Sequence, residues 1–174
     1  INLSAQWVRS GQSGQYMACA NPHSLVVSEN DPLFSDALHN ANLLLPDGAG
    51  IIMAARVLNL PIKERVAGTE FFLGLSGRLS STGGARYFFL GSSEHVLALL
   101  RQRLEKEYPS ITVCGTYSPP FKSEFSDEDN AAMIAAVNAA KPDVLWVGMT
   151  APKQEKWIYQ NKDILNVPFI GAIG

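Results

Sequence analysis

The stretch RYFFLGSSEHVLALLRQRLEKEY, residues 86–108, joins two different hydrophobic patterns. Residues 86–91 are apolar almost without interruption, which is typical of a short strand covered on both faces. Across residues 92–108 apolar side chains recur every four positions, which predicts an amphipathic helix. The apolar stripe consists of Val96, Leu100 and Leu104, with Leu97 and Tyr108 beside it. A buried strand followed by such a helix is the repeating unit of a parallel α/β sheet.

The same alternation runs through the rest of the chain. Further strands are predicted at residues 16–20, 43–46, 111–115, 143–149 and 167–174. Further helices are predicted at residues 22–40, 48–59, 69–81, 126–140 and 152–161, with a short one at the start. The helix from residue 48 is apolar almost all round, so we expect it to be buried. The sequence therefore predicts one α/β domain over residues 1–174, a parallel sheet with helices on both faces.

Composition excludes several classes of protein. Apolar residues make up 47% of the 174 and charged residues 17%, which favours a folded domain over a disordered chain. The net charge of −2 gives no broad basic surface, so we expect no nucleic-acid partner. Cys19 and Cys114 lie in apolar runs, which favours free thiols and a reducing cytoplasm. No run is long enough to span a bilayer, and no signal-peptide pattern begins the chain.

Polar residues and glycines follow each predicted strand, where ligands bind in parallel sheets. They include Asn21, Asp47, Gly91, Tyr117 and the stretch MTAPKQ (149–154). Glycine lets the backbone approach a phosphate closely, and helix-start N–H groups favour anions. Neither a GxGxxG nor a Walker A pattern is present, so ligand contact and simple turn geometry both remain open.

Asp47, in LLPDGAG (44–50), has two interpretations. An Asp followed by Gly before a helix is typical of an N-cap, whose carboxylate accepts a backbone hydrogen bond. A carboxylate at a strand end also suits a general base.

Two cationic residues have similar alternatives. Lys153 falls in the first turn of a predicted helix, against the helix dipole, and a diphosphate there would offset that small cost. The alternative is a solvated Lys-Gln-Glu-Lys surface. Arg65, in the charged turn Lys63-Glu64-Arg65, could point inward as an anion clamp.

The sequence predicts no metal site. Asp127-Glu128-Asp129 matches a DxD string, but Ser126 is a suitable N-cap and three acids in a first helical turn compensate the dipole. The three histidines lack ligand spacing with one another or with the cysteines.

Four stretches together resemble the bacterial WecG/TagA/CpsF glycosyltransferase family. They are NPHSLVV, ANLLLPDGAGIIMAARVLNLPIKERVAGTEF, YFFLG and VGMTAPKQEKWI. The resemblance implies a Rossmann-like fold and an inverting, metal-independent enzyme without a cofactor. Such an enzyme moves a sugar like N-acetylmannosamine from a UDP-sugar to a polyprenyl-diphosphate-linked acceptor in cell-surface polysaccharide synthesis.

The resemblance also assigns roles to residues. It implies that Asp47 is the general base and that Asn21, Arg65 and Gln154 bind substrate. An inverting displacement needs a base for the acceptor hydroxyl, and the leaving diphosphate needs charge compensation. We expect Lys153 and the turn at Gly91 to assist with the diphosphate, and Tyr117 to stack on uracil.

The chain also departs from the family pattern. Cys19 stands where the family often has Thr. A C-terminal extension implicated in membrane docking does not follow residue 174, so we expect a truncated chain that docks at the inner face of the membrane when complete. The apolar surface that a missing tail exposes favours self-association. Two alternatives stay open, a non-catalytic nucleotide-binding domain and, less favoured without a Gly-rich fingerprint, an NAD(P)-linked oxidoreductase.

Overall fold

The structure, a computed structural model, describes residues 1–174 as six strands and eight helices. The strands are β1 (Gln15–Ala20), β2 (Leu43–Pro46), β3 (Ala85–Gly91), β4 (Ile111–Tyr117), β5 (Val144–Gly148) and β6 (Phe169–Ala172). The helices are α1 (Asn2–Ser10), α2 (Pro22–Ser28), α3 (Pro32–His39), α4 (Ala49–Val57), α5 (Gly68–Ser80), α6 (Glu94–Glu107), α7 (Asp127–Ala140) and α8 (Lys153–Asn161). The predicted alternation of strands and helices is confirmed.

One predicted helix, over residues 22–40, is divided into α2 and α3. Asp31 has an extended backbone, as expected for a residue before proline, and its side chain accepts a hydrogen bond from Phe34 N at 3.0 Å. Pro32 then occupies the first turn of α3, where its missing N–H has no cost. The sequence predicts a single helix here because the residues before and after the break are similarly prone to form a helix.

All six strands are parallel and lie in the order β2-β1-β6-β5-β3-β4. The central pairs are in continuous register, with Val144 of β5 opposite Tyr87 on one side and Phe169 on the other. Because the strands are parallel, their carboxyl ends meet at one edge of the sheet. The predicted α/β class is confirmed.

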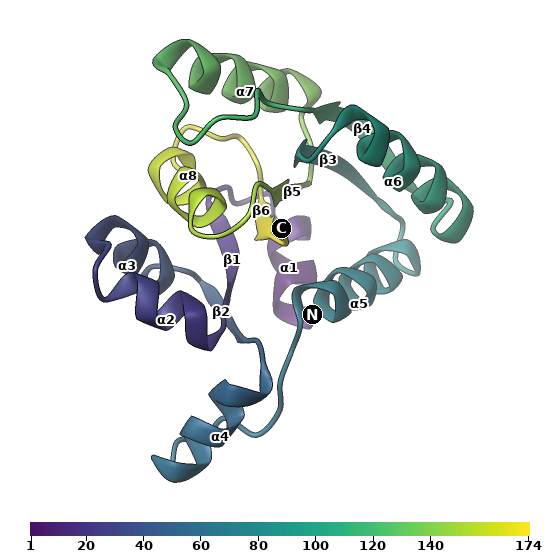
Figure 1. Ribbon diagram of the computed structural model, residues 1–174. Coiled ribbons are helices and arrows are strands. Elements are labelled where there is room, and N and C mark those ends of the chain that lie inside the picture. The colour runs from purple at the N-terminus through teal and green to yellow at the C-terminus, as the bar shows by residue number, and fades with distance from the viewer.

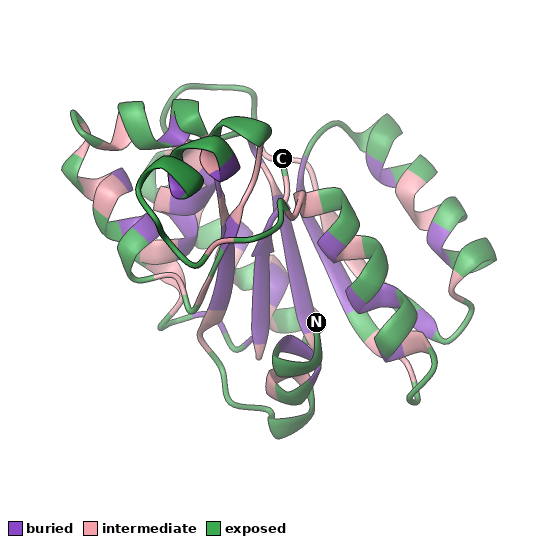
Figure 2. Cartoon of the chain, turned by 90° about the horizontal axis from the view of Figure 1, so that it is seen from below, coloured by how far each residue is buried: buried purple, intermediate pink, exposed green.

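Helices cover both faces of the sheet (Figure 1). On one face α1, α5 and α6 pack on a cluster that includes Tyr87, Phe89 and Trp146. On the other, α7 and α8 pack on a cluster that includes Phe88 and Leu90, and α3 covers β1 beside them. Successive residues of β3 thus enter opposite cores, which explains why this strand is apolar throughout. Figure 2 shows the buried strands between the exposed outer faces of the helices.

The helix α6 is turned slightly from the predicted orientation. Leu97 and Leu104 are buried, and Leu100 and Tyr108 pack beside them, whereas Val96 is 41% exposed. The stripe that faces the sheet therefore follows a spacing of three and four residues from Leu97, and the prediction that Val96 belongs to it is wrong. Ser93 caps the helix by accepting a hydrogen bond from Val96 N.

The prediction that the helix after residue 48 is buried is also wrong. In α4 only Ile52 and Ala55 are buried, while Met53 and Val57 are 66% and 80% exposed. The helix follows β2, the edge strand, and projects away from the body of the molecule (Figure 1). Although α4 is apolar on all sides, it lies beyond the edge of the sheet, and most of its apolar side chains are exposed. No helix in the structure combines the length and hydropathy that a bilayer crossing needs.

The packing of β6 against β5 can be tested at Gly171, where a Cβ atom would clash with the buried ring of Trp146. Gly171→Ala should lower the free energy of unfolding by about 1–3 kcal/mol, because neither the sheet nor the ring can move freely. Gly77→Ala is the matched control, since nothing lies within 4 Å of a Cβ at that exposed position of α5. We expect the control to gain about 0.5–1 kcal/mol. Urea denaturation measures both; equal effects would contradict this packing.

Candidate active site

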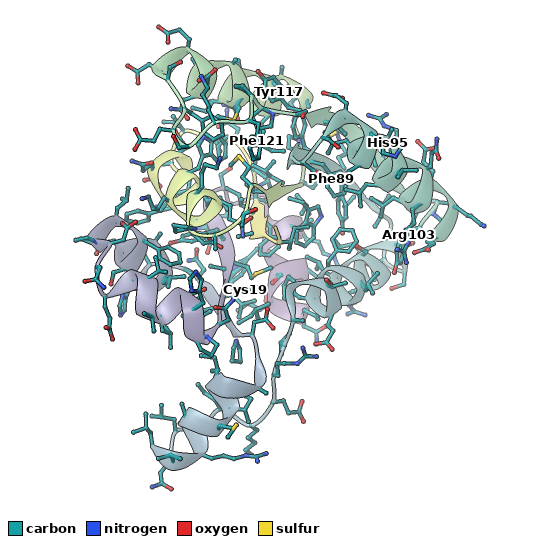
Figure 3. The ribbon with its side chains drawn as sticks, in the orientation of Figure 1. Cys19, Phe89, His95, Arg103, Tyr117 and Phe121 are labelled. Carbon is teal, nitrogen blue, oxygen red and sulfur yellow. The ribbon has the colours of Figure 1, made fainter.

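Two neighbouring cavities lie at the carboxyl ends of the strands. The first has a volume of about 170 Å³ and is lined at its polar part by Cys19, Asn21, Asp47, Gln154 and Glu155, which together define the carboxylate cavity. The second has a volume of about 650 Å³ and is lined by residues that include Ser92, Ser118, Phe121, Thr150 and Lys153, which define the lysine cavity. The start of α8 separates them, since Lys153 lines one and Gln154 the other. In Figure 3, Cys19 marks the carboxylate cavity, and Phe121 the lysine cavity.

The structure answers the question of whether Asp47 is a helix cap. The N-cap of α4 is Gly48, at φ 93°, and no side chain caps this helix. The backbone N–H of Asp47 donates to Ala20 O at 2.8 Å and ties the end of β2 to β1. No hydrogen bond or ion pair of the chain uses its carboxylate, which lines the carboxylate cavity. The capping interpretation is therefore wrong, and the carboxylate is free to act on a ligand.

Asn21 stands beside Asp47 at the end of β1. Its Oδ1 accepts hydrogen bonds from Ser24 N at 2.9 Å and Ser24 Oγ at 3.1 Å, which caps α2. Capping fixes the orientation of the side chain and occupies its oxygen. The Asn21 amide group remains as a hydrogen-bond donor at the cavity.

Gln154 is buried, and hydrogen bonds use both ends of its amide. Its Oε1 accepts from Met149 N at 3.2 Å and Gly174 N at 3.0 Å. Its Nε2 donates to Glu155 Oε1 at 2.9 Å and Gly174 O at 3.2 Å. Gln154 thus joins the turn after β5, the start of α8 and the residues after β6. This geometry gives it a positioning role at the cavity wall.

Glu155 is a site residue that the sequence analysis missed. It is 1% exposed and lines the carboxylate cavity. Burial raises the pKa of its carboxyl, although the hydrogen bond from Gln154 opposes this. Burial, with Asp47 and Glu155 as further causes, also raises the pKa of the Cys19 thiol to about 12, so the thiol is neutral. A signal was available, because Glu155 precedes the buried Ile158 by three residues on one helical stripe.

The lysine cavity has a cationic and an aromatic wall. Lys153 Nζ donates to Lys122 O at 2.7 Å and lies 5.0 Å from the centre of the Phe125 ring. Phe121, which was not predicted as a site residue, is fully exposed at the rim of this cavity. Ser92 and Thr150 both have positive φ angles, 61° and 66°. Such conformations in non-glycine residues concentrate at functional sites.

Gly91, which precedes this cavity, has a structural reason to be glycine. Its φ is 114°, and a Cβ atom there would clash with Gly148 O of the neighbouring strand. The close approach of β3 and β5 therefore accounts for this residue without a ligand. Its predicted contact with a diphosphate stays a prediction.

Arg65 and Tyr117 lie outside both cavities. Arg65 pairs with Glu70 at 3.1 Å, and its side chain is 48% exposed. It is two residues from Ala67, which lines the carboxylate cavity. Tyr117, at the end of β4, packs against the core beneath α7 and α8, and it is the next residue, Ser118, that reaches the lysine cavity. Substrate binding by either residue stays a prediction.

The acids that start α7 serve the helix. Ser126 Oγ accepts a hydrogen bond from Asp129 N, and the Asp129 carboxylate accepts one from Ser126 N at 2.8 Å and pairs with Lys122. This reciprocal capping box confirms the capping interpretation of the DxD string. No group of three His, Cys, Asp or Glu side chains in residues 1–174 has the spacing of a metal site.

The sheet topology and the covering helices define a Rossmann-like α/β protein, with two cavities at the carboxyl ends of its strands. The family model of the glycosyl transferase WecG/TagA/CpsF family matches residues 1–174, and the chain belongs to this family.

Three curated relatives carry the same name, N-acetylglucosaminyldiphosphoundecaprenol N-acetyl-beta-D-mannosaminyltransferase. The Bacillus spizizenii protein is 27% identical over 161 residues, which cover 92% of this chain and 59% of the relative. The Bacillus subtilis protein is 28% identical over 87% of this chain and 56% of the relative. The Staphylococcus aureus protein is 22% identical over 99% of this chain and 65% of the relative. The chain thus spans about three fifths of the length of these relatives.

The structural roles of Gln154 and Asp47 can be separated by their effects on stability. Gln154→Leu leaves the buried N–H of Met149 without a partner, breaks the hydrogen bonds to Gly174, and should cost about 2 kcal/mol. Asp47→Asn removes no hydrogen bond and should change the free energy of unfolding by less than about 0.5 kcal/mol. Denaturant titration of both variants measures this. A large loss in Asp47→Asn would restore a structural role for that carboxylate.

Proposed function

We propose that this chain is the nucleotide-sugar-binding and catalytic part of an inverting glycosyltransferase. It transfers an N-acetylmannosamine-like sugar from a UDP-sugar to a polyprenyl-diphosphate-linked acceptor sugar in cell-surface polysaccharide synthesis. The relatives' printed name, which gives the transferred sugar and a diphosphoundecaprenol acceptor, supports this proposal. The observation that carries it is the unbonded Asp47 carboxylate in a cavity beside a lysine-lined one.

Asp47 acts as the general base. The acceptor hydroxyl attacks the anomeric carbon of the donor sugar while Asp47 takes its proton, so that the new carbon–oxygen bond forms as the bond to UDP breaks. A carboxylate without a structural partner can accept this proton at no cost to the fold. Asn21, held by Ser24, donates from its amide to a sugar oxygen in the same cavity.

The lysine cavity takes the UDP part of the donor. Lys153 turns from the Lys122 carbonyl to the diphosphate and offsets the negative charge that builds up on the leaving group. The backbone N–H of Lys153, at the start of α8, favours the same anion. Phe121, fully exposed at the rim, offers an aromatic face for uracil, which makes it a second candidate beside Tyr117.

The acceptor hydroxyl enters the carboxylate cavity at Asp47, and the rest of the acceptor extends beyond the two cavities. Arg65, on the segment between α4 and α5, can exchange Glu70 for an acceptor or donor phosphate by a side-chain rotation. A polyprenyl-linked acceptor supports the proposal that transfer takes place at the inner face of the membrane. Transfer needs no metal or cofactor, because cationic side chains and helix N–H groups compensate the diphosphate.

The central test is a transfer assay with UDP-N-acetylmannosamine and a soluble lipid-diphosphate-sugar analogue, on the full-length natural polypeptide. Asp47→Asn should lower kcat by about 10²- to 10⁴-fold, as expected for loss of a general base, while KM for the donor stays within a few-fold. Asp163→Asn, on an exposed carboxylate after α8, is the matched control and should transfer normally.

Two results would contradict the proposal. If Asp47→Asn transfers at the wild-type rate, Asp47 is not the base. If the wild type binds UDP but shows no transfer to any acceptor in a panel, the chain is a nucleotide-binding domain without transferase activity. Binding of NADH in place of UDP, measured by calorimetry, would assign it to the oxidoreductases.

Metal independence gives a separate prediction. Incubation with excess EDTA, followed by gel filtration, should leave the initial transfer rate within about 20% of the untreated enzyme, because the proposed charge compensation comes from the chain itself. Loss of transfer that added Mg²⁺ or Mn²⁺ restores would show that a cation supplies part of this compensation.

A further inference from the structure

The carboxylate cavity contains a second acid that the proposed reaction does not use. Glu155 is 1% exposed and lies in the first turn of α8. Its Oε1 accepts a hydrogen bond from Gln154 Nε2 at 2.9 Å, whereas its Oε2 is buried and has no partner in the chain. The only other unpartnered buried side-chain atoms belong to Ser4 and Trp146, which line neither cavity. An unpartnered buried oxygen calls for an explanation, and a ligand that completes its hydrogen bonding is one.

We propose that Glu155 binds the donor sugar as a hydrogen-bond donor, through a proton on Oε2 that a sugar hydroxyl or acetamido oxygen accepts. The inference rests on the proposed function, because it takes the carboxylate cavity as the place of the sugar. In this proposal Glu155 recognises the donor sugar through a hydrogen bond, and Asp47 alone abstracts the proton.

The charges around the cavity favour an uncharged ligand group. Its titratable side chains are Cys19 from β1, Asp47 after β2 and Glu155 from α8. The segment at the start of α5 contributes residues 67–69 and the end of β6 contributes residues 172–174, none of them charged. Since no Lys or Arg lines the cavity, a diphosphate would meet two acids and no cation there. A sugar ring, neutral and rich in hydroxyl groups, fits this lining.

The same lining favours the protonated form of Glu155. An ionised carboxylate would be buried beside Asp47 without a cationic partner, which is costly. Burial accordingly raises the pKa of Glu155, and the hydrogen bond from Gln154 opposes this. Two carboxyl groups in one site with different environments commonly divide the roles of donor and acceptor. Asp47 then accepts the proton of the attacking hydroxyl while Glu155 holds the sugar.

Affinity measurements on the full-length natural polypeptide test the inference, with UDP and UDP-N-acetylmannosamine as probes in calorimetry. Glu155→Leu removes the hydrogen-bond donor and keeps a similar side-chain volume. It should lower the affinity for UDP-N-acetylmannosamine by about tenfold to a hundredfold, as expected for loss of one buried hydrogen bond. UDP itself should bind within about twofold of wild type, because it occupies the lysine cavity. Glu155→Gln offers an oxygen to Gln154 and an N–H to the sugar, so it should stay within about fivefold for both probes. Glu105→Gln, on the exposed face of α6, is the matched control.

The results distinguish this inference from the proposed function. If Glu155→Leu binds both probes as the wild type does, or if Glu155→Gln is as defective as Glu155→Leu, the inference is wrong and the proposed function stands. If the wild type binds neither probe, the proposed function is wrong, and the inference falls with it.

Stability against pH gives a readout that needs no ligand. A carboxyl with a raised pKa in the folded state binds a proton more tightly there than in the unfolded chain, whose Glu titrates near about 4.3. Its contribution to stability is therefore present below that pH and is lost as the pH rises through the pKa of the folded state. Glu155→Gln should remove this loss, so that the variant gains stability relative to the wild type as the pH rises above the value at which Glu titrates in the unfolded chain. A parallel pH dependence in both proteins would show that Glu155 is ionised, and would contradict the inference.

Discussion

Parallel pairing of all six strands brings their carboxyl ends to one edge, and this constraint places the acids and the lysine that line the two cavities. Asn21 and Asp47 come from β1 and β2, on one side of the central strand β6, and the α8 residues come after β5, on the other. An antiparallel partner anywhere among these strands would carry one of them to the opposite edge. The hydrogen bonds of Gln154 fix the result, because they join the turn after β5 to the end of β6.

The start of α8 divides the edge into two chemically different cavities. Consecutive side chains, Lys153 and Gln154, face a cationic and an acidic cavity, as the helical rotation of about 100° per residue allows. A ligand that spans both must carry a negative group on one side and a neutral polar group on the other. A nucleotide sugar has this division, and a dinucleotide, with its diphosphate between two nucleosides, fits it less well.

The sequence was sufficient to predict the architecture and to predict that Asn21, Asp47 and Lys153 lie at one edge of the sheet. It was not sufficient where contacts between distant parts of the chain decide the structure. Continuous apolar strands and four-residue stripes predict the sheet and nearly all helices, because both patterns are local. The exposure of α4 depends on the position of β2 at the sheet edge, which no local pattern reveals. Asp47 was open to interpretation as an N-cap because Asp-Gly before a helix usually caps it. The structure shows that the N-cap is Gly48 and that no side chain caps the helix. In the string Lys-Gln-Glu-Lys, Glu155 has the appearance of an exposed charged residue. Its spacing of three residues from the buried Ile158 puts it on the buried side of the helix.

The central claim is that one donor molecule occupies both cavities, with its sugar against Asp47. A crystal structure of the protein soaked with UDP-N-acetylmannosamine at low temperature tests this most directly. The account predicts the diphosphate against Lys153 and the sugar ring among Asn21, Asp47 and Glu155. Density for the sugar outside the carboxylate cavity, or for the diphosphate between Asp47 and Glu155, would contradict it.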